Sequence, residues 1–418
     1  MEFLDDKQVE AINLYSKIDL PILPTLFFEF HGMNDRDLMA ALGRLGQGLW
    51  SVTMKTPPRP RGGKIQLGFL SRNLKNHTIG GLMAGVIEHL DRSVFDVVVL
   101  SVGHYDDRIG RRIRECATRY VEVPPSLPGA LHVVAGQALD ILFYPDIGMD
   151  PFTYTLAFTR LAPVEVVTWG HPVTTGLPSV DYFISSEDLD PPDGQSHYTE
   201  KLARLRTLSI FYERPVPPTP LKARSFFGLD DKAHIYACPQ TLFKFHPDFD
   251  ELLGQILRGD PDGIVTLIEG RYPTWNDVLQ KRFEKTIPDV VNRIRWVQRQ
   301  SRENYLNLLA VSDLMLDPTH FGGGNSSYEG LALGIPIVTL PSEFLKDRIT
   351  YALYKKMGVT DCIVSSREDY VRLALELGTD PSRRQTMREK ILANCGVLFE
   401  DYQAVRELGE FLKSIARR

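Results

Sequence analysis

Cysteine is scarce in this chain, and its few copies are not spaced as metal ligands or as a disulfide framework. The four residues, Cys116, Cys238, Cys362 and Cys395, lie far apart in a sequence of 418 residues. Zinc-binding cysteines usually come in closely spaced pairs, and disulfide-rich domains are short and dense in cysteine. We therefore expect four free thiols, held in a reducing compartment.

Long apolar runs are absent as well. No stretch approaches the roughly 20 apolar residues that a membrane-spanning helix requires. The first ten residues, MEFLDDKQVE, are acidic, whereas a secretory signal is basic at first and then apolar. These absences predict a cytoplasmic protein that does not insert into membranes.

The sequence also lacks an excess of positive charge. The net charge is −5 at pH 7 and the isoelectric point is about 6.1. This argues against nucleic acid or an anionic membrane as the main partner. With 43% hydrophobic and 24% charged residues, the composition is that of a globular protein. At roughly 150 residues per domain, the length predicts two or three domains.

The first 60 residues differ from the rest of the chain. Residues 35–50, DRDLMAALGRLGQGLW, have the pattern of an amphipathic helix, and residues 55–64, KTPPRPRGGK, that of a proline-rich linker. Tandem helical repeats with a period of about 34 residues are not found anywhere in the chain.

From residue 64 onward, short apolar runs alternate with helical segments. In the first series the strand-like runs are 64–70, 95–102, 139–146 and 164–170, and the helix-like segments are 79–91 and 108–117. After PVPPTP (215–220), a second series has strand-like runs at 234–239, 263–270, 292–298, 313–318 and 335–341. Such alternation implies right-handed crossovers and a parallel sheet.

Two doubly wound units in succession predict an α/β chain of the GT-B class, with two Rossmann-like lobes facing across a cleft. The expected parts are a helical extension with its linker (1–60), an N-terminal lobe (61–215), a C-terminal lobe (216–395) and a final helix (396–418). Ligands of such sheets bind at the carboxyl ends of the strands.

The most informative segment is 313–341, DLMLDPTHFGGGNSSYEGLALGIPIVTLP. Its three glycines (322–324) follow a buried strand and precede a helix. Glycines let the backbone approach a ligand closely, and the free N–H groups at a helix start favour an anion. Ser326 and Ser327 can cap that helix or donate to phosphate, and Glu329 can accept from ribose hydroxyls. A flexible loop with ordinary capping is the alternative. The segment is neither a Walker loop nor a GxGxxG fingerprint.

This segment and several others resemble the catalytic region of the O-GlcNAc transferase family, which includes bacterial cytoplasmic N-glycosyltransferases of the adhesin-modifying type. The matching blocks, in family order, are 67–80, 169–205, 238–247 and 313–358. Eukaryotic members carry tetratricopeptide repeats ahead of this region, and this chain has only a short helical segment there. The family's His-Thr-Thr loop reads Gly324-Asn325-Ser326 here, which is closer to the loop of the N-glycosyltransferases.

The resemblance implies a site for a UDP-sugar, with no cofactor and no metal. Lys244 matches the lysine that grips the donor diphosphate, where a point charge stabilises the departing nucleoside diphosphate. Asn325 and Ser326 fall at diphosphate contacts, and Glu329 falls at the carboxylate that holds the ribose. The full set of expected donor contacts is Gln240, Lys244, His320, Gly323, Gly324, Asn325, Ser326, Glu329 and Arg348. For His320 a structural role, and for Arg348 a surface ion pair, are equally open.

Two histidines are candidate catalytic residues beside Lys244. His77 matches a family histidine placed in the cleft, and His171 falls where the N-glycosyltransferases carry histidine and many other members carry tyrosine. A histidine can accept a proton near neutral pH, as attack by a hydroxyl requires. An amide nucleophile is poorer and needs another form of activation. Either histidine could instead position the acceptor.

Other patterns are interpreted as structural. Asp188 and Asp190 form an Asp-x-Asp pair of the kind that binds metal in the other major glycosyltransferase fold, but they lie in a proline-rich loop without that architecture. Asp181-Tyr182 belongs to a strand. The remaining histidines, such as His89, His132 and His234, are expected to pack or to lie at the surface.

The sequence thus predicts an inverting, metal-independent transfer of a hexose or N-acetylhexosamine from a UDP-sugar to a protein side chain. It leaves open serine or threonine against asparagine as acceptor, and glucose against N-acetylglucosamine as the sugar. The alternatives are a small-molecule glycosyltransferase, a UDP-sugar epimerase, and a silent module that binds the donor without turnover.

Overall fold

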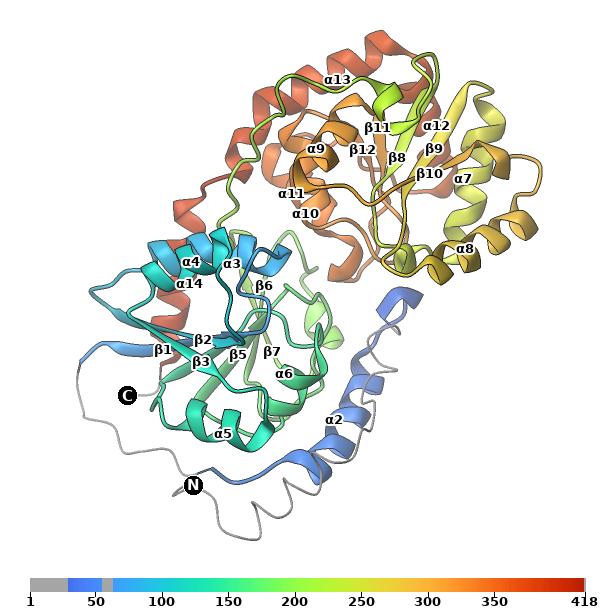
Figure 1. The fold of residues 1–418 in the computed structure, drawn as a ribbon. Coiled ribbons are helices and arrows are strands. Elements are labelled where there is room, and N and C mark those ends of the chain that lie inside the picture. Colours follow the sequence, from blue (N-terminus) through green and yellow to red (C-terminus); the bar gives the residue numbers. More distant parts are fainter. Residues whose placement is uncertain (1–28, 55–62, 417–418) are drawn as a thin grey trace. The chain divides into compact units, whose positions relative to one another are not determined.

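The computed structural model describes residues 29–54 and 63–416, which form two compact units (Figure 1). The first unit contains Met33–Glu213 and the C-terminal segment from Glu400. The second contains Arg214–Phe399 together with the short segment Glu29–Gly32. Most of the linker predicted at 55–64 lies outside the described residues.

The first unit is built on a seven-stranded sheet in the order β3-β2-β1-β4-β5-β6-β7, with all neighbours parallel. The strands are β1 (Ile65–Ser71), β2 (Phe95–Val102), β3 (Arg119–Val123), β4 (Ile141–Tyr144), β5 (Val164–Thr168), β6 (Tyr182–Ser186) and β7 (Lys201–Leu205). The helices are α2 (Arg36–Trp50), α3 (Thr78–His89), α4 (Arg108–Cys116), α5 (Leu127–Ala135), α6 (Pro151–Leu156) and α14 (Tyr402–Ile415).

The second unit is built on a five-stranded parallel sheet in the order β10-β9-β8-β11-β12. Its strands are β8 (His234–Cys238), β9 (Gly263–Ile268), β10 (Ile294–Val297), β11 (Leu314–Leu316) and β12 (Ile337–Val338). Its helices are α7 (Pro247–Gly259), α8 (Pro273–Thr286), α9 (Arg302–Val311), α10 (Asn325–Ala332), α11 (Ile349–Met357), α12 (Arg367–Thr379) and α13 (Pro381–Asn394).

Each sheet is covered by helices on both faces (Figure 1). The central strands are therefore buried on both sides and are mostly apolar, as β2 and β4 show. This is why the runs expected at 64–70, 95–102 and 164–170, and their counterparts in the second series, are confirmed as strands. The helix expected at 35–50 is confirmed as α2, where Gly43 and Gly46 allow close contact with the Gly176 carbonyl and the Phe158 ring.

The strand order reverses at one point in each sheet. In the first unit β1 and β4 are neighbours, and in the second unit β8 and β11 are neighbours. The chain leaves these pairs in opposite directions, and doubly wound proteins bind their ligands at the carboxyl ends of such a pair. The loops after β1 and β4, and those after β8 and β11, are therefore the positions where a functional site is expected.

Asp190, Asp181 and His89, which the sequence analysis interprets as structural, each contact neighbouring side chains of the first unit. The buried Asp190 carboxylate accepts hydrogen bonds from Tyr198 Oη at 3.0 Å and from the Ser185 hydroxyl. Asp181 pairs with Arg160 at 2.7 Å and accepts the Glu165 backbone N–H. The His89 ring packs against the rings of Phe211 and Tyr402, which also contact each other.

The C-terminal helix begins later than the expected residue 396. Residues 395–398 form a short 3-10 helix in the second unit, and α14 begins at Tyr402 in the first unit. Asp401 caps it by accepting the backbone N–H groups of Gln403 and Ala404. Across the described chain, no helix combines the length and the apolar character that crossing a membrane would take.

A buried carboxyl in β5 makes the stability of the first unit depend on pH. Glu165 is fully buried, and burial raises its pKa from 4.5 to about 8 although Leu161 and Ala162 donate backbone N–H groups to it. Between pH 4.5 and 8 the folded state therefore holds a proton that the unfolded state has lost. Its contribution is complete below the lower value and is lost as the pH rises through this window.

We expect Glu165→Gln to flatten the decline of the thermal midpoint between pH 5 and pH 8, because glutamine does not ionise. The exposed Glu115 on α4, changed to glutamine, is the control and should keep the wild-type slope. Thermal unfolding at several pH values measures this. An unchanged slope in Glu165→Gln would show that the buried carboxyl does not titrate in this range.

Candidate functional site

In the second unit, Lys244 joins the two loops at the reversal of the strand order. It follows β8 and lies in the short 3-10 helix Leu242–Lys244. Its Nζ donates to the Gly322 carbonyl at 2.8 Å, to Gln240 Oε1 at 3.1 Å, and lies 4.5 Å from the centre of the Phe321 ring. The ammonium is therefore fixed against the glycine loop that follows β11.

A second link between the loops comes from Gln240. Its Nε2 donates to Ser326 Oγ at 2.7 Å, in the first turn of α10. Gly323 lies close to the hydrogen bond between Gln240 and Ser326. A Cβ added to it would lie 2.9 Å from Gln240 Nε2 and 2.4 Å from Ser327 Oγ. A larger residue would therefore have to displace these side chains, and α10 begins two residues later, at Asn325.

The buried carboxylate of Asp317 fixes the glycine loop (residues 322–324) by a hydrogen bond. Asp317 follows β11, accepts the Gly323 N–H at 2.6 Å, and accepts the Thr339 hydroxyl at 2.9 Å. Burial raises its pKa to about 6, against the effect of these hydrogen bonds and of the Lys244 charge. The loop conformation therefore depends on a side chain that lies beneath the surface.

Burial also affects Lys244 itself. It lowers the pKa of the ammonium from 10.5 to about 8, while the charges of Asp317, Cys238 and Glu29 raise it. At pH 7 the side chain is still mainly protonated. A partly dehydrated cation held in one position interacts strongly with an anion, because few water molecules screen it.

Glu329 lies on α10 and is almost completely buried. Its Oε1 is 3.2 Å from Nη1 of Arg302, the exposed first residue of α9. Sequence reasoning missed Arg302. Its place in the sequence could have indicated it, because Arg302 opens the helix that follows β10 and so lies near the carboxyl edge of the sheet, as the glycine loop does.

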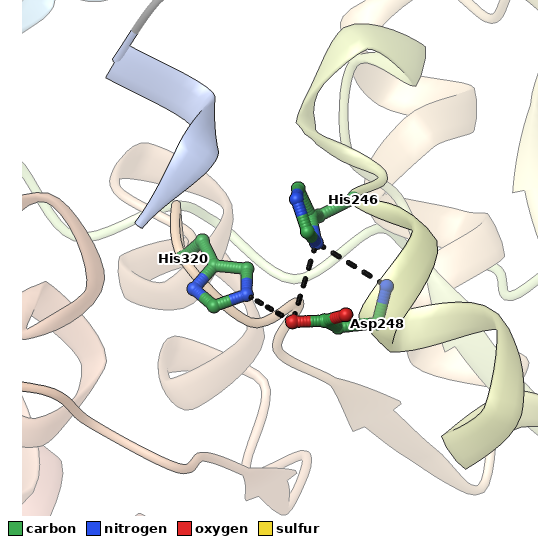
Figure 2. Close-up of side chains that lie close together, drawn as sticks. All are labelled: His246, Asp248 and His320. Atoms are coloured by element: carbon green, nitrogen blue, oxygen red, sulfur yellow. Dashed lines mark hydrogen bonds and ion pairs between the residues drawn. The ribbon is translucent and has the colours of Figure 1, made fainter. Parts of the chain in front are cut away.

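His320 pairs with Asp248. Its Nε2 hydrogen-bonds Asp248 Oδ2 at 2.9 Å, and its ring stands nearly perpendicular to that of His246, with 4.5 Å between the centres (Figure 2). Its backbone has a positive φ of 73°, a conformation that non-glycine residues seldom adopt without support. We call His246, Asp248 and His320 the histidine clamp.

The histidine clamp has the side chains of a possible metal site, and these side chains also bond to one another. His246 Nδ1 accepts the Asp248 backbone N–H at 3.2 Å and so caps α7, while Asp248 accepts from His320. Burial, together with the charges of His320, His31 and Arg282, lowers the pKa of His246, and the start of α7 adds further positive potential. The clamp ties His320, which directly precedes Phe321 and the glycine loop (residues 322–324), to the start of α7.

Arg348 stabilises its own loop. Its Nη1 donates to the Ser342 carbonyl at 2.9 Å, and its guanidinium lies 4.4 Å from the centre of the Tyr351 ring. The structure therefore brings together Lys244, Gln240, the glycine loop and Ser326, with Glu329 on the same helix. It connects His320 and Arg348 to neighbours outside that group.

In the first unit, His77 is the N-cap of α3, after β1. Its Nδ1 accepts the Ile79 backbone N–H at 3.3 Å. Burial and the nearby Lys75 lower its pKa, which favours the neutral ring. In a neutral ring whose Nδ1 is the acceptor, Nε2 carries the proton. His77 is then equipped to donate a hydrogen bond and not to accept a proton.

His171 follows β5 and is buried. It packs against Gly148 in the loop after β4, where φ is 109° and an added Cβ would lie 2.4 Å from His171 Cδ2. The same loop carries Asp146, which accepts from Ser71 Oγ at 3.0 Å and Asn73 Nδ2 at 2.7 Å. Burial raises the Asp146 pKa to about 6. Sequence reasoning missed this aspartate.

Both units match one family of known proteins. The profile of Glycosyl transferase family 41 matches residues 51–214 and 212–403. The probable UDP-N-acetylglucosamine–peptide N-acetylglucosaminyltransferase SEC of Arabidopsis thaliana is 23% identical over 399 residues, which cover 92% of this chain and 40% of that protein. The UDP-glucose:protein N-beta-glucosyltransferase of Actinobacillus pleuropneumoniae serotype 7 is 26% identical over 259 residues, covering 62% of this chain and 41% of that protein.

Solved structures agree on the fold. An O-GlcNAc transferase mutant from Thermobaculum terrenum superposes with a TM-score of 0.80 at 24% identity, covering 99% of this chain and 78% of that chain. Anabaena Alr3699/HepE, solved with UDP and glucose, gives 0.58 at 12% identity, covering 84% of this chain and all of that one. The predicted GT-B class is thereby confirmed. The chain spans about two fifths of the length of the curated relatives above, and by its profile match it belongs to Glycosyl transferase family 41.

Proposed function

We propose that this chain transfers a hexose or N-acetylhexosamine from a UDP-sugar to a serine, threonine or asparagine side chain of a polypeptide, with inversion and without a metal. The observation that carries this is the junction of Lys244 with Gly322, Gln240 and Ser326 at the carboxyl ends of β8 and β11. The names of the plant and Actinobacillus relatives support the donor class and the protein acceptor.

Diphosphate charge can be met by the protein at this junction. Lys244 supplies a fixed positive charge, and the first turn of α10 supplies backbone N–H groups and the positive end of a helix dipole. As the bond to the sugar breaks, negative charge grows on the leaving diphosphate, and preorganised groups of this kind stabilise it most at that moment. We therefore assign Asn325 and Ser326 to the diphosphate and Glu329 to the ribose.

Inversion follows from a single displacement, and the loop carboxylates support it. Asp317 is beneath the loop and is used by Gly323 and Thr339, while Glu329 pairs with Arg302. Neither is placed to form a covalent intermediate with the sugar. The four cysteines are all unpaired, which supports a reducing, cytoplasmic location.

The direct test is intact-mass analysis of candidate acceptor proteins incubated with the full chain and a panel of UDP-sugars. We expect one acceptor to gain the mass of a hexose or N-acetylhexosamine, to the same extent in excess EDTA and in added Mg²⁺ or Mn²⁺. Loss of transfer in EDTA alone would contradict the metal-free mechanism. Conversion of the UDP-sugar without any acceptor would identify an epimerase instead.

Lys244 should be needed for turnover more than for folding. We expect Lys244→Met to lower kcat/KM for the donor by about 10²-fold or more, since removing one preorganised charge typically costs that much. Methionine keeps the apolar packing against Phe321, so the thermal midpoint should change little. Lys281→Met, at an exposed position of α8, is the control. Near-normal turnover in Lys244→Met would remove the lysine from the donor site.

The tautomer of His77 predicts different roles for His77 and His171 in proton transfer. Because its Nδ1 caps α3, His77→Asn keeps a capping group and should lower activity without moving the acidic limb of the pH profile of kcat/KM. His171→Ala should abolish that limb if His171 accepts the acceptor's proton. Both variants should bind UDP within about threefold of wild type. Loss of the limb in His77→Asn would reverse these roles.

A further inference from the structure

The short segment Glu29–Gly32 packs on the residues next to Lys244. Phe30 is buried, and its ring centre lies 4.9 Å from that of Phe243 and 4.7 Å from that of Phe321. Phe243 immediately precedes Lys244, and Phe321 immediately precedes Gly322, whose carbonyl accepts from the lysine. One ring from the start of the described chain therefore contacts both loops of the junction.

The contact with Phe321 reaches the ammonium directly. Lys244 Nζ lies 4.5 Å from the centre of the Phe321 ring, so this ring interacts with the cation and also packs against Phe30. If Phe30 is removed, Phe321 loses a packing partner and can move. The ammonium then loses its aromatic support, and the Gly322 carbonyl loses a fixed neighbour.

At the other end of the segment, Gly32 packs closely against His320 of the histidine clamp. Gly32 has a φ of 66°, and a Cβ added to it would lie 2.1 Å from His320 Nδ1. The His31 ring lies edge-on to His246, with 6.0 Å between the centres. The segment lies beside His320 in the close-up, as a short blue ribbon (Figure 2). It is thus held at Phe30 by aromatic packing and at Gly32 by close backbone approach.

The segment also contributes charge. Glu29 is 6% exposed, and its carboxylate opposes the effect of burial on Lys244 by raising the pKa of the ammonium. The other charged or titratable groups that act on Lys244 are Asp317 from the end of β11 and Cys238 from the end of β8. Glu29 differs from these two because it lies outside the Arg214–Phe399 part of the second unit.

We propose that Glu29–Gly32 is an integral part of the donor site and that Phe30 is a positioning residue, which sets the place of the Lys244 ammonium through Phe321. This rests on the proposed role of Lys244 as the diphosphate ligand. The segment therefore tunes the affinity for the nucleoside diphosphate, although it precedes both sheets in the sequence.

The test compares UDP binding by calorimetry in the full chain carrying Phe30→Ala, Phe30→Tyr or Phe226→Ala. We expect Phe30→Ala to raise the Kd for UDP about tenfold and Phe30→Tyr, which keeps the ring, to restore it to near wild type. Phe226 is an exposed phenylalanine of the same unit, and its loss should have no effect. Thermal unfolding of each variant separates a local change from loss of the fold.

The variant Glu29→Gln tests whether the Glu29 charge raises the pKa of Lys244. Removing the carboxylate should lower the pKa of Lys244 further, so UDP affinity should fall at a lower pH than in wild type as the lysine loses its proton. The affinity at pH 6, where the ammonium is charged in both proteins, should be nearly equal. A pH profile identical to wild type would contradict this role of Glu29.

Two outcomes with UDP would overturn the proposal. An unchanged Kd in Phe30→Ala would show that the segment does not affect the site, and a lower Kd would show that it competes with the donor. If wild type does not bind UDP, the proposed function fails, and a second measurement still tests the segment. The rate at which acetic anhydride acylates Lys244, followed by peptide mass spectrometry, should rise severalfold in Phe30→Ala. An equal rate would contradict the contact.

Discussion

The arrangement of the two loops at the strand-order reversal of the second unit depends on one half-buried cation, the Lys244 ammonium. Lys244 reaches across the reversal of the strand order and donates to the Gly322 carbonyl at 2.8 Å. A partly dehydrated ammonium is costly unless its hydrogen bonds are made, so the loop after β8 and the loop after β11 are fixed together. Gly323 leaves room for the Gln240 and Ser327 side chains, and its N–H donates to the buried Asp317 carboxylate. An anion that binds there meets a positive charge whose position is already fixed.

The fold was predictable where burial leaves a simple pattern. Central strands such as β2 and β4 lie between two layers of helices and are mostly apolar, so their positions could be predicted to within a few residues. The edge strands β3 and β7 were missed because RYVEV and KLARL mix charged and apolar residues. A strand with one free edge and exposed side chains carries little periodic signal.

The candidate site was predictable from patterns that are local in sequence. The glycine loop could be named because a strand, a turn and a helix start lie within a few residues of one another, and Lys244 because its segment resembles the O-GlcNAc transferase family. Their role as a donor site stays a prediction. Contacts between distant segments could not be predicted. The pairing of Glu329 with Arg302, the capping role of His77 Nδ1 and the packing of Phe30 on Phe321 each depend on tertiary structure. The histidine clamp is such a case, because His246 and His320 are far apart in the chain.

A crystal structure of the protein with UDP, grown in the presence of EDTA, tests the central claim most directly. The account predicts a diphosphate oxygen within hydrogen-bond distance, about 2.7–3.2 Å, of Lys244 Nζ and of backbone N–H groups at the start of α10. It predicts no metal ion between the phosphates and the protein. A diphosphate bound away from Lys244 and the glycine loop would contradict it.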